Sequence, residues 1–272
     1  MGRKLKKHKI MESVAMIIPM YNKVRYIEQT LQSVDKIQYK NFECIIIDDE
    51  STDGSSDIAI QFAKARPDRF RYIRVLNGGV SRARNFGVRC ADADYVCFLD
   101  ADDEVYSDYV TRGVEAYNKY NIDLYLENIK IRQNDRYINY INKDICETEG
   151  DSIILSGEDC IRRGIMLNFC GGLYKRDMVL RYNFLENVHI EDVIFLQNYV
   201  HHSKNVYVNF KDDAIIYNEI YSERNLSHDL GNNWSEYVCN KINELTDNKY
   251  PLYVDYKRSD EDGLLYWEIK QR

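Results

Sequence analysis

The sequence lacks several features that would mark particular classes of protein. It contains no apolar run of about 18 residues or more, so no segment is expected to span a membrane. No secretory signal peptide is apparent, because the apolar stretch over residues 10–20 is interrupted by Glu12. The seven cysteines form no Cys-x-x-Cys pair, which favours reduced, buried thiols and argues against zinc. These absences predict a cytoplasmic protein, and 272 residues suffice for one large domain with a small appendage.

Positive charge is also in short supply. The chain has 37 Lys and Arg against 44 Asp and Glu, a net charge of −7, so its main surface is not expected to bind nucleic acid. The exception is the basic arm at residues 2–9. Such an arm is typical of a solvated terminus, but it is also able to contact anionic phospholipid, at ~1 kcal/mol per basic residue.

The first hundred residues alternate between short apolar runs and helical patterns. Strands are expected at residues 13–18, 42–47, 70–75 and 95–99, with helices at 25–34, 55–65 and 81–88. This alternation predicts an α/β fold with a mostly parallel central sheet and helices on both faces. The first strand is followed by Pro19-Met20-Tyr21-Asn22 and not by Gly-x-Gly-x-x-Gly, which argues against a nicotinamide dehydrogenase, and no P-loop occurs.

Three carboxylates, Asp100, Asp102 and Asp103, directly follow the strand expected at residues 95–99. Ligands of open α/β sheets bind beyond the carboxyl ends of the strands, which is where these acids should lie. Mg²⁺ or Mn²⁺ bridging to substrate phosphates would offset their mutual repulsion. The alternative is a solvated acidic turn that caps the next helix.

Five ordered segments resemble family 2 glycosyltransferases, which have the GT-A fold and transfer sugars from nucleotide-sugar donors. The resemblance covers roughly residues 13–200 and rests on these stretches: Ile17–Asn22, Ile47–Ser55, Gly79–Gly87, Phe98–Asp103 and, after Gly172–Arg176, Glu191–Phe195. One departure is Glu50, where the family usually carries a small residue, often glycine. The resemblance implies that the protein is an inverting, metal-dependent glycosyltransferase of the hexosyltransferase type.

The resemblance also implies roles for residues in the donor site. Pro19 and Tyr21 would line the nucleotide base, although an aromatic residue such as Tyr21 more often packs in a core. Asp49, with Asp48 beside it, would accept a hydrogen bond from uracil N3–H, the alternative being a helix cap. Capping is the favoured role of Asp53.

The third and fourth segments would complete the donor and metal sites. Arg82, Arg84 and Asn85 lie near the start of a helix, where arginines suit phosphates, although arginines on a short helix usually form a solvated face. In the acidic segment the resemblance assigns Asp102 to the ribose or the metal, Asp103 to the metal and Asp100 to their support on the donor side. The cofactor would be Mn²⁺ or Mg²⁺.

Asp192 is the candidate catalytic base. In the inverting members that the chain resembles, a carboxylate at this position takes the proton of the acceptor hydroxyl. The alternative is that Glu191 and Asp192 only place negative charge at the start of a helix, where it interacts favourably with the helix dipole. Both roles are compatible.

The expected organisation is a basic arm at 1–12, a GT-A domain at 13–230 and a C-terminal helical extension at 231–272. The domain would divide into a nucleotide-sugar-binding half, 13–105, and an acceptor half, 106–230, with a hairpin near residues 133–135. Two amphipathic helices around Trp234 and Trp267 would serve packing or self-association into a homodimer. Residues 221–228 loosely resemble a loop that in relatives closes over the donor phosphates, in which His228 would be either an added metal ligand or a surface histidine.

The resemblance implies a UDP-sugar as the donor. It implies a glycan or lipid-linked acceptor in the synthesis of a bacterial surface polysaccharide or glycoconjugate. Alternatives are a catalytically silent nucleotide-sugar-binding module and a metal-dependent phosphohydrolase. The phosphohydrolase is disfavoured because three strand–helix units precede the acidic segment. A processive polysaccharide synthase would carry Gln-x-x-Arg-Trp and membrane helices, and neither is visible.

Overall fold

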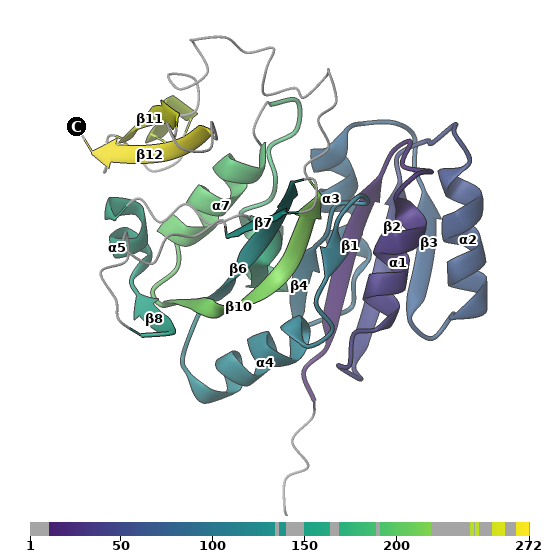
Figure 1. Cartoon of the computed structure of the whole chain (residues 1–272), viewed down its shortest axis with the longest axis horizontal. Helices are drawn as coiled ribbons and strands as arrows, with labels where there is room; N and C mark the ends of the chain where they lie inside the picture. The colour runs from purple at the N-terminus through teal and green to yellow at the C-terminus, as the bar shows by residue number, and fades with distance from the viewer. Residues whose placement is uncertain are drawn as a thin grey trace, which may run out of the picture.

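One ten-stranded sheet flanked by helices forms the main body of the protein (Figure 1). The computed structural model describes residues 11–133, 136–139, 150–163, 169–188, 191–218, 240–241, 243–244, 252–258 and 265–271. The sheet runs in the order β3-β2-β1-β4-β9-β6-β10-β5. The predicted mixed α/β fold with a mostly parallel central sheet is confirmed for this body.

The first four strands along the chain pair parallel with one another. They are β1 (Val14–Met20), β2 (Phe42–Asp48), β3 (Phe70–Arg74) and β4 (Tyr95–Phe98). All seven residues of β1 are buried, which explains its unbroken apolar sequence. The expectation that Pro19 ends this strand is wrong. Pro19 pairs with Ile47 and Met20 with Asp48, because a proline removes only one donor from the ladder.

Three helices connect these strands, namely α1 (Ile27–Asp35), α2 (Ser55–Ala65) and α3 (Val80–Cys90). Strand order reverses after β3, so right-handed crossovers place α1 and α2 on one face and α3 on the other (Figure 1). Helix α3 lies close to β1 because Gly87 has no side chain. A Cβ there would lie 2.4 Å from the Cγ2 of Ile17.

The second half extends the same sheet with mixed pairing. Strand β9 (Gly172–Lys175) is antiparallel to β4 and to β6 (Leu124–Gln133), which in turn is parallel to β10 (Val206–Asn218). The predicted hairpin is confirmed, because β7 (Arg136–Asn139) pairs antiparallel with β6. The remaining elements are β5 (Glu104–Val105), α4 (Tyr109–Lys119), β8 (Ser152–Leu155), α5 (Gly157–Arg162), η2 (Phe169–Gly171), α6 (Arg176–Arg181) and α7 (Glu191–His201).

An aromatic cluster joins the two halves beneath the carboxyl end of β4. Phe98 of β4 contacts the rings of Phe169, Phe184 and Phe195 at centroid distances of 5.1–5.9 Å. The rings of Phe184 and Phe195 stack at 3.9 Å. The second half therefore supplies part of the core that supports the end of β4.

The prediction of a helical extension at the C-terminus is wrong for residues 252–258 and 265–271. Strands β11 (Leu252–Arg258) and β12 (Leu265–Gln271) pair antiparallel, with Tyr256 opposite Trp267. Aromatic and β-branched residues, which both segments contain, favour strands once a partner strand is available. Trp234 and the loop 221–228 lie outside the described residues. No helix in the described part of the chain is long and apolar enough to cross a membrane.

Candidate active site

The candidate site lies at the carboxyl ends of β1, β2 and β4. The loops after β1 and β2 are tied together, because Thr52 N donates to Asn22 Oδ1 at 2.8 Å and Lys23 N donates to Ser55 Oγ at 2.7 Å. The N-cap of α2 is Gly54, and Asp53, one residue before it, accepts from Ser55 N at 3.0 Å at the start of the helix. These bonds hold the two loops as one rigid surface.

Asp48 is part of a buried network and is fully shielded from solvent. Its carboxylate accepts hydrogen bonds from Ser51 N at 2.8 Å, Ser56 Oγ at 2.5 Å and Tyr72 OH at 2.5 Å. Burial acts to raise the pKa of Asp48, but these hydrogen bonds outweigh it and the pKa lies below its usual value. The side chain is therefore an ionised anchor of the loop after β2.

Asp49 faces the start of α3. Its two carboxylate oxygens accept from Gly78 N and Gly79 N, each at 2.9 Å, and its own carbonyl oxygen accepts from Asn77 Nδ2 at 3.1 Å. Gly79 has φ +84°, a backbone conformation that favours glycine. Each carboxylate oxygen has a second acceptor position, so a hydrogen bond to a nucleotide base stays compatible with this geometry.

Glu50, the departure from the family pattern, has a left-handed backbone with φ +70°. Side chains with a Cβ adopt this conformation at a cost, which explains why a glycine suits the position. The carboxylate of Glu50 accepts from Asn77 N at 3.2 Å. The loops after β2 and β3 are thus joined by two neighbouring acids.

Tyr21 is 48% exposed, so it does not pack in the core. Pro19 beside it is buried at the end of β1. An exposed aromatic ring at the carboxyl end of a parallel strand is available for stacking on a planar ligand. The position is compatible with the predicted contact to a nucleotide base.

The three residues predicted on α3 differ in their surroundings. Arg82 is exposed, whereas Arg84 and Asn85 are buried. The side-chain amide of Asn85 forms two hydrogen bonds with the backbone of Phe184. It donates to the carbonyl oxygen at 2.8 Å and accepts from the N–H at 3.0 Å. Of the three side chains, Arg82 is the one that a ligand in solution reaches directly.

Arg84 joins two segments that are distant in the sequence. Its Nη2 donates to Asp100 Oδ1 and its Nη1 to Glu191 Oε1, both at 2.8 Å. Burial acts to lower the pKa of Arg84, but the two carboxylates outweigh this effect and raise it. Sequence analysis did not identify this arrangement, because the Glu191 partner is 107 residues away.

The acidic segment after β4 contains one carboxylate in a partly exposed ion pair and one carboxylate that is buried. Lys23 Nζ forms an ion pair with Asp102 Oδ2, and Asp103 is 1% exposed. Burial raises the pKa of Asp102, Lys23 opposes the shift and Asp100 adds to it. The pKa of Asp102 therefore lies above its usual value despite the ion pair with Lys23. Lys23 is a further site residue that the sequence analysis missed.

The donor set of this segment fits a hard divalent cation. Carboxylate oxygens are the ligands that Mg²⁺ and Mn²⁺ prefer, and Mg²⁺ usually takes one or two of them together with waters and substrate phosphates. Within the described residues, no three His, Cys, Asp or Glu side chains gather as a complete metal site. Asp102 and Asp103 would thus supply part of a coordination sphere that phosphate oxygens complete.

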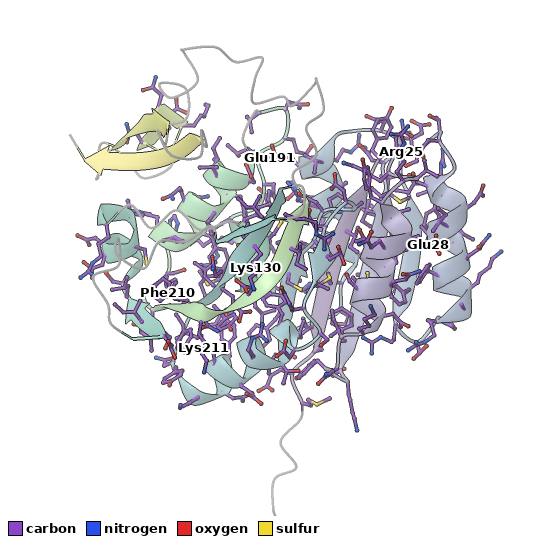
Figure 2. The ribbon with its side chains drawn as sticks, in the orientation of Figure 1. Arg25, Glu28, Lys130, Glu191, Phe210 and Lys211 are labelled. Carbon is purple, nitrogen blue, oxygen red and sulfur yellow. The ribbon has the colours of Figure 1, made fainter. Side chains whose placement is uncertain are left out.

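Asp192 lies in the first turn of α7, next to Glu191, and both side chains are partly buried. Its Oδ1 accepts from Val193 N at 2.8 Å. Burial and the neighbouring charge of Glu191 raise the pKa of Asp192 to about 6, against the opposing effect of Arg84. Figure 2 shows Glu191 at the upper edge of the molecule, the edge at which Arg25 precedes α1. The predicted base thus lies at the same edge as the loops after β1.

The model of the family described as "Glycosyl transferase family 2" matches residues 15–178. The chain belongs to this family. The glycosyltransferase GlyA of Streptococcus pneumoniae is 34% identical over 117 residues, which cover 43% of this chain and 17% of GlyA. The chain spans less than two thirds of the length of the curated relatives that it matches.

Solved structures share the fold of this family member. TarS of S. aureus (residues 1–349) in complex with UDP-GlcNAc aligns with a TM-score of 0.70 at 18% identity, over 86% of this chain and 66% of TarS. The mannosyltransferase PcManGT from Pyrobaculum calidifontis, in complex with GDP-Man and Mn²⁺, aligns with a TM-score of 0.58 at 17% identity, over 80% and 59% of the two chains. The fold is that of the GT-A glycosyltransferases, as predicted.

Proposed function

We propose that the chain is an inverting, metal-dependent glycosyltransferase that moves one sugar from a UDP-sugar to a hydroxyl of a glycan or lipid-linked acceptor. The observation that carries this proposal is the junction at Arg84, where one guanidinium binds Asp100 of the acidic segment and Glu191 beside the candidate base. The junction brings the groups that would bind a diphosphate near the group that would accept a proton. Membership of the family supports the same reaction.

In this reaction Asp192 accepts the proton of the acceptor hydroxyl while the hydroxyl oxygen attacks the anomeric carbon. The new carbon–oxygen bond forms as the bond to the β-phosphate oxygen breaks, and the nucleoside diphosphate leaves with the electron pair. A pKa of about 6 makes Asp192 a stronger base than an ordinary aspartate while leaving it ionised at neutral pH. In-line attack inverts the anomeric configuration.

The acidic segment would bind the diphosphate end of the donor. Asp103 and Asp102 would hold Mn²⁺ or Mg²⁺, and the bound cation would neutralise charge on the leaving diphosphate. Lys23 pairs with Asp102, so it lies within reach of the same phosphates. Asp100, which pairs with Arg84, would support the segment from the protein side.

The base and ribose end of the donor would lie along the loops after β1 and β2. Tyr21 and Pro19 would contact the base, Asp49 would accept from its N–H, and Arg82 would contact the phosphates. Asp48 has three close hydrogen-bond donors and Asn85 is engaged with Phe184, so we propose that these two hold the site rather than touch the donor. The UDP and UDP-GlcNAc complexes of TarS favour uracil, whereas PcManGT was solved with GDP-Man.

The experiment is a calorimetric titration of UDP into the purified protein with Mn²⁺ and then with excess chelator. We expect Mn²⁺-dependent binding of UDP and much weaker binding of GDP and CMP. Binding of GDP in preference to UDP would contradict the choice of nucleotide but not the class of enzyme. Failure of every nucleotide to bind would contradict the proposal and favour a degenerate, silent module.

The biological setting is part of the same proposal. We place the reaction in the cytoplasm, in the synthesis of a bacterial surface polysaccharide or glycoconjugate, with the basic residues 2–9 contacting anionic membrane lipid. Residues 1–10 and the loop 221–228 with His228 lie outside the described residues, so the support here is the sequence alone. Vesicle co-sedimentation with and without phosphatidylserine tests the membrane contact, and sedimentation velocity tests the homodimer.

A further inference from the structure

Arg84 occupies an unusual environment for a residue in a ligand-binding segment. Its side chain is 3% exposed, and its two terminal nitrogens bind Asp100 and Glu191 at 2.8 Å each. Its guanidinium carbon lies 4.4 Å from the ring centre of Phe169 and 5.2 Å from that of Phe184. Carboxylates bind its edge and aromatic rings cover its faces, which leaves little of the group for a ligand.

Arg84 and the residues that it contacts belong to separate parts of the chain. Arg84 belongs to α3, Asp100 follows β4, Phe169 lies in η2 and Glu191 begins α7. The planar fork of an arginine fixes both the distance and the direction of each carboxylate that it binds. The residue is therefore a rigid link between the acidic segment and the first turn of α7.

We propose that Arg84 is a positioning residue that holds the first turn of α7, and with it Asp192, against the acidic segment, and that it does not bind the donor. The inference rests on the proposed function for its catalytic consequence. Its structural part, the fixing of α7, stands on the contacts alone. Glu191 transmits the effect, because it is bound to Arg84 and is the residue next to Asp192.

The charged and titratable groups around Asp192 are consistent with this role. Glu191 on α7 and Asp100 after β4 act on it with negative charge, and Arg84 on α3 acts with positive charge. Burial raises the pKa of the Cys170 thiol in η2, and the negative charges of Asp100, Asp103 and Asp192 add to that rise. Arg84 is the cation among these groups, so its removal would leave Asp100 and Glu191 to repel each other and Asp192.

The test compares Arg84→Lys and Arg84→Gln with Arg89→Gln, an exposed arginine on the same helix. Donor affinity is measured by calorimetry with Mn²⁺, and kcat at saturating donor. We expect donor Kd to stay within about 3-fold of the wild type and kcat to fall ~10²-fold or more for Arg84→Gln, with partial recovery in Arg84→Lys. Arg89→Gln should match the wild type. Loss of donor binding with kcat retained would overturn the inference and support direct binding.

A second measurement does not depend on turnover. Hydrogen exchange of residues 191–195 should accelerate in both Arg84 variants, and in Glu191→Gln, while exchange in β1 and β2 stays unchanged. Unchanged exchange at 191–195 would overturn the inference even for a protein that proved to be a silent module. A wild type that binds no nucleotide would contradict the proposed function and leave this result to decide the structural link.

A double-mutant cycle guards against simple unfolding of Arg84→Gln. Glu191→Gln removes the ion pair between Arg84 and Glu191, and Asp100→Asn removes the ion pair between Arg84 and Asp100. Each substitution retains the size of the side chain. Because Arg84 and Glu191 act as one unit, the effect of Arg84→Lys with Glu191→Gln on kcat should be much smaller than the product of the single effects. Full multiplicativity would mean that the two residues act independently and would contradict the proposed link.

Discussion

Two acidic regions at the same edge of the sheet shift the pKa values of their carboxylates in opposite directions. In the loop after β2, burial acts against the charged forms of Asp48 and Asp53, yet protein hydrogen bonds lower the pKa of both. Around the end of β4, burial raises the pKa of Asp102, and it raises that of Asp192 to about 6. The first region is a completed scaffold, whereas the second retains unfavourable charge that a cation or a proton relieves.

The largest effect that would test this contrast is on turnover. Asp192→Asn removes the base without changing the size of the side chain, so we expect kcat to fall ~10²–10⁴-fold while donor affinity is unchanged. Turnover assays at saturating UDP-sugar, with calorimetry of UDP binding, check both parts. Normal turnover in Asp192→Asn would show that another group, or none, accepts the proton.

The hydrogen-bond network around Asp48 predicts an effect on the free energy of unfolding. Asp48→Asn removes a buried charge and leaves its hydroxyl and N–H donors poorly matched, so the free energy of unfolding should fall by about 3 kcal/mol. Urea denaturation measures this change. Asp57→Asn, at an exposed position in the first turn of α2, should change stability by less than ~0.5 kcal/mol. Equal losses in the two variants would mean that the network around Asp48 contributes little.

The acidic segment predicts an effect on metal-dependent binding. Asp103→Ala should weaken UDP binding in the presence of Mn²⁺ by ~10–100-fold, to the level that the wild type shows with chelator. The control is Asp92→Ala, because Asp92 is exposed and lies just before the first residue of β4, at the end away from the acidic segment. This variant should bind UDP normally. A wild-type response to Mn²⁺ in Asp103→Ala would remove Asp103 from the metal site.

The raised pKa of Asp192 also predicts a dependence of stability on pH. A carboxyl whose pKa is higher in the folded state than in the unfolded state favours folding below its unfolded pKa of about 3.9, and that contribution is lost as pH rises through about 6. Asp192→Asn should therefore be more stable than the wild type at pH 8, by ~1–2 kcal/mol, with the difference shrinking as pH falls through about 6 and nearly absent by pH ~4.

The matched control for this measurement is Asp177→Asn. Asp177 accepts from the next backbone N–H at 2.8 Å in the first turn of α6, as Asp192 does in α7, but its side chain is exposed. Thermal unfolding of both variants between pH 4 and pH 8 separates burial from the local hydrogen bond. The same gain in stability for Asp177→Asn would attribute the effect to the helix start and not to the buried site.

The smallest effect concerns the left-handed backbone of Glu50. Glu50→Gly relieves the backbone cost but loses the hydrogen bond to Asn77 N, whereas Glu50→Ala loses only the hydrogen bond. The glycine variant should exceed the alanine variant in unfolding free energy by about 1 kcal/mol. A more stable alanine variant would show that the strain at this position is negligible.

Much of the first half of the fold follows from local sequence. The apolar runs of β1, β2 and β4 predict buried parallel strands, and the helix predicted at residues 55–65 is found at Ser55–Ala65. The strand end at Pro19 was wrong because the ladder tolerates one missing donor. The C-terminal strands were missed because Leu265–Gln271 pairs with a partner strand whose presence local periodicity does not indicate.

The site was predicted less completely than the fold. Local motifs identify which acids cluster after β4, but they do not give the pairing of Lys23 with Asp102, which joins residues 79 positions apart. For the same reason the neighbours of Arg84 on α3 suggested phosphate binding but did not indicate its ion pairs with Asp100 and Glu191, which come from other elements. Charge pairing across a fold depends on packing that no short window of sequence contains.

The pair of hydrogen bonds between Asn85 and Phe184 has a consequence for the synthesis of this protein. Two hydrogen bonds at 2.8 and 3.0 Å join residues that are 99 positions apart, and the ring of Phe184 packs against Phe98. The first half therefore leaves the ribosome without the residues that cover the end of β4. At typical rates of about 5–20 residues per second, its core waits several seconds or more for completion. During that interval a chaperone has an exposed aromatic surface to bind.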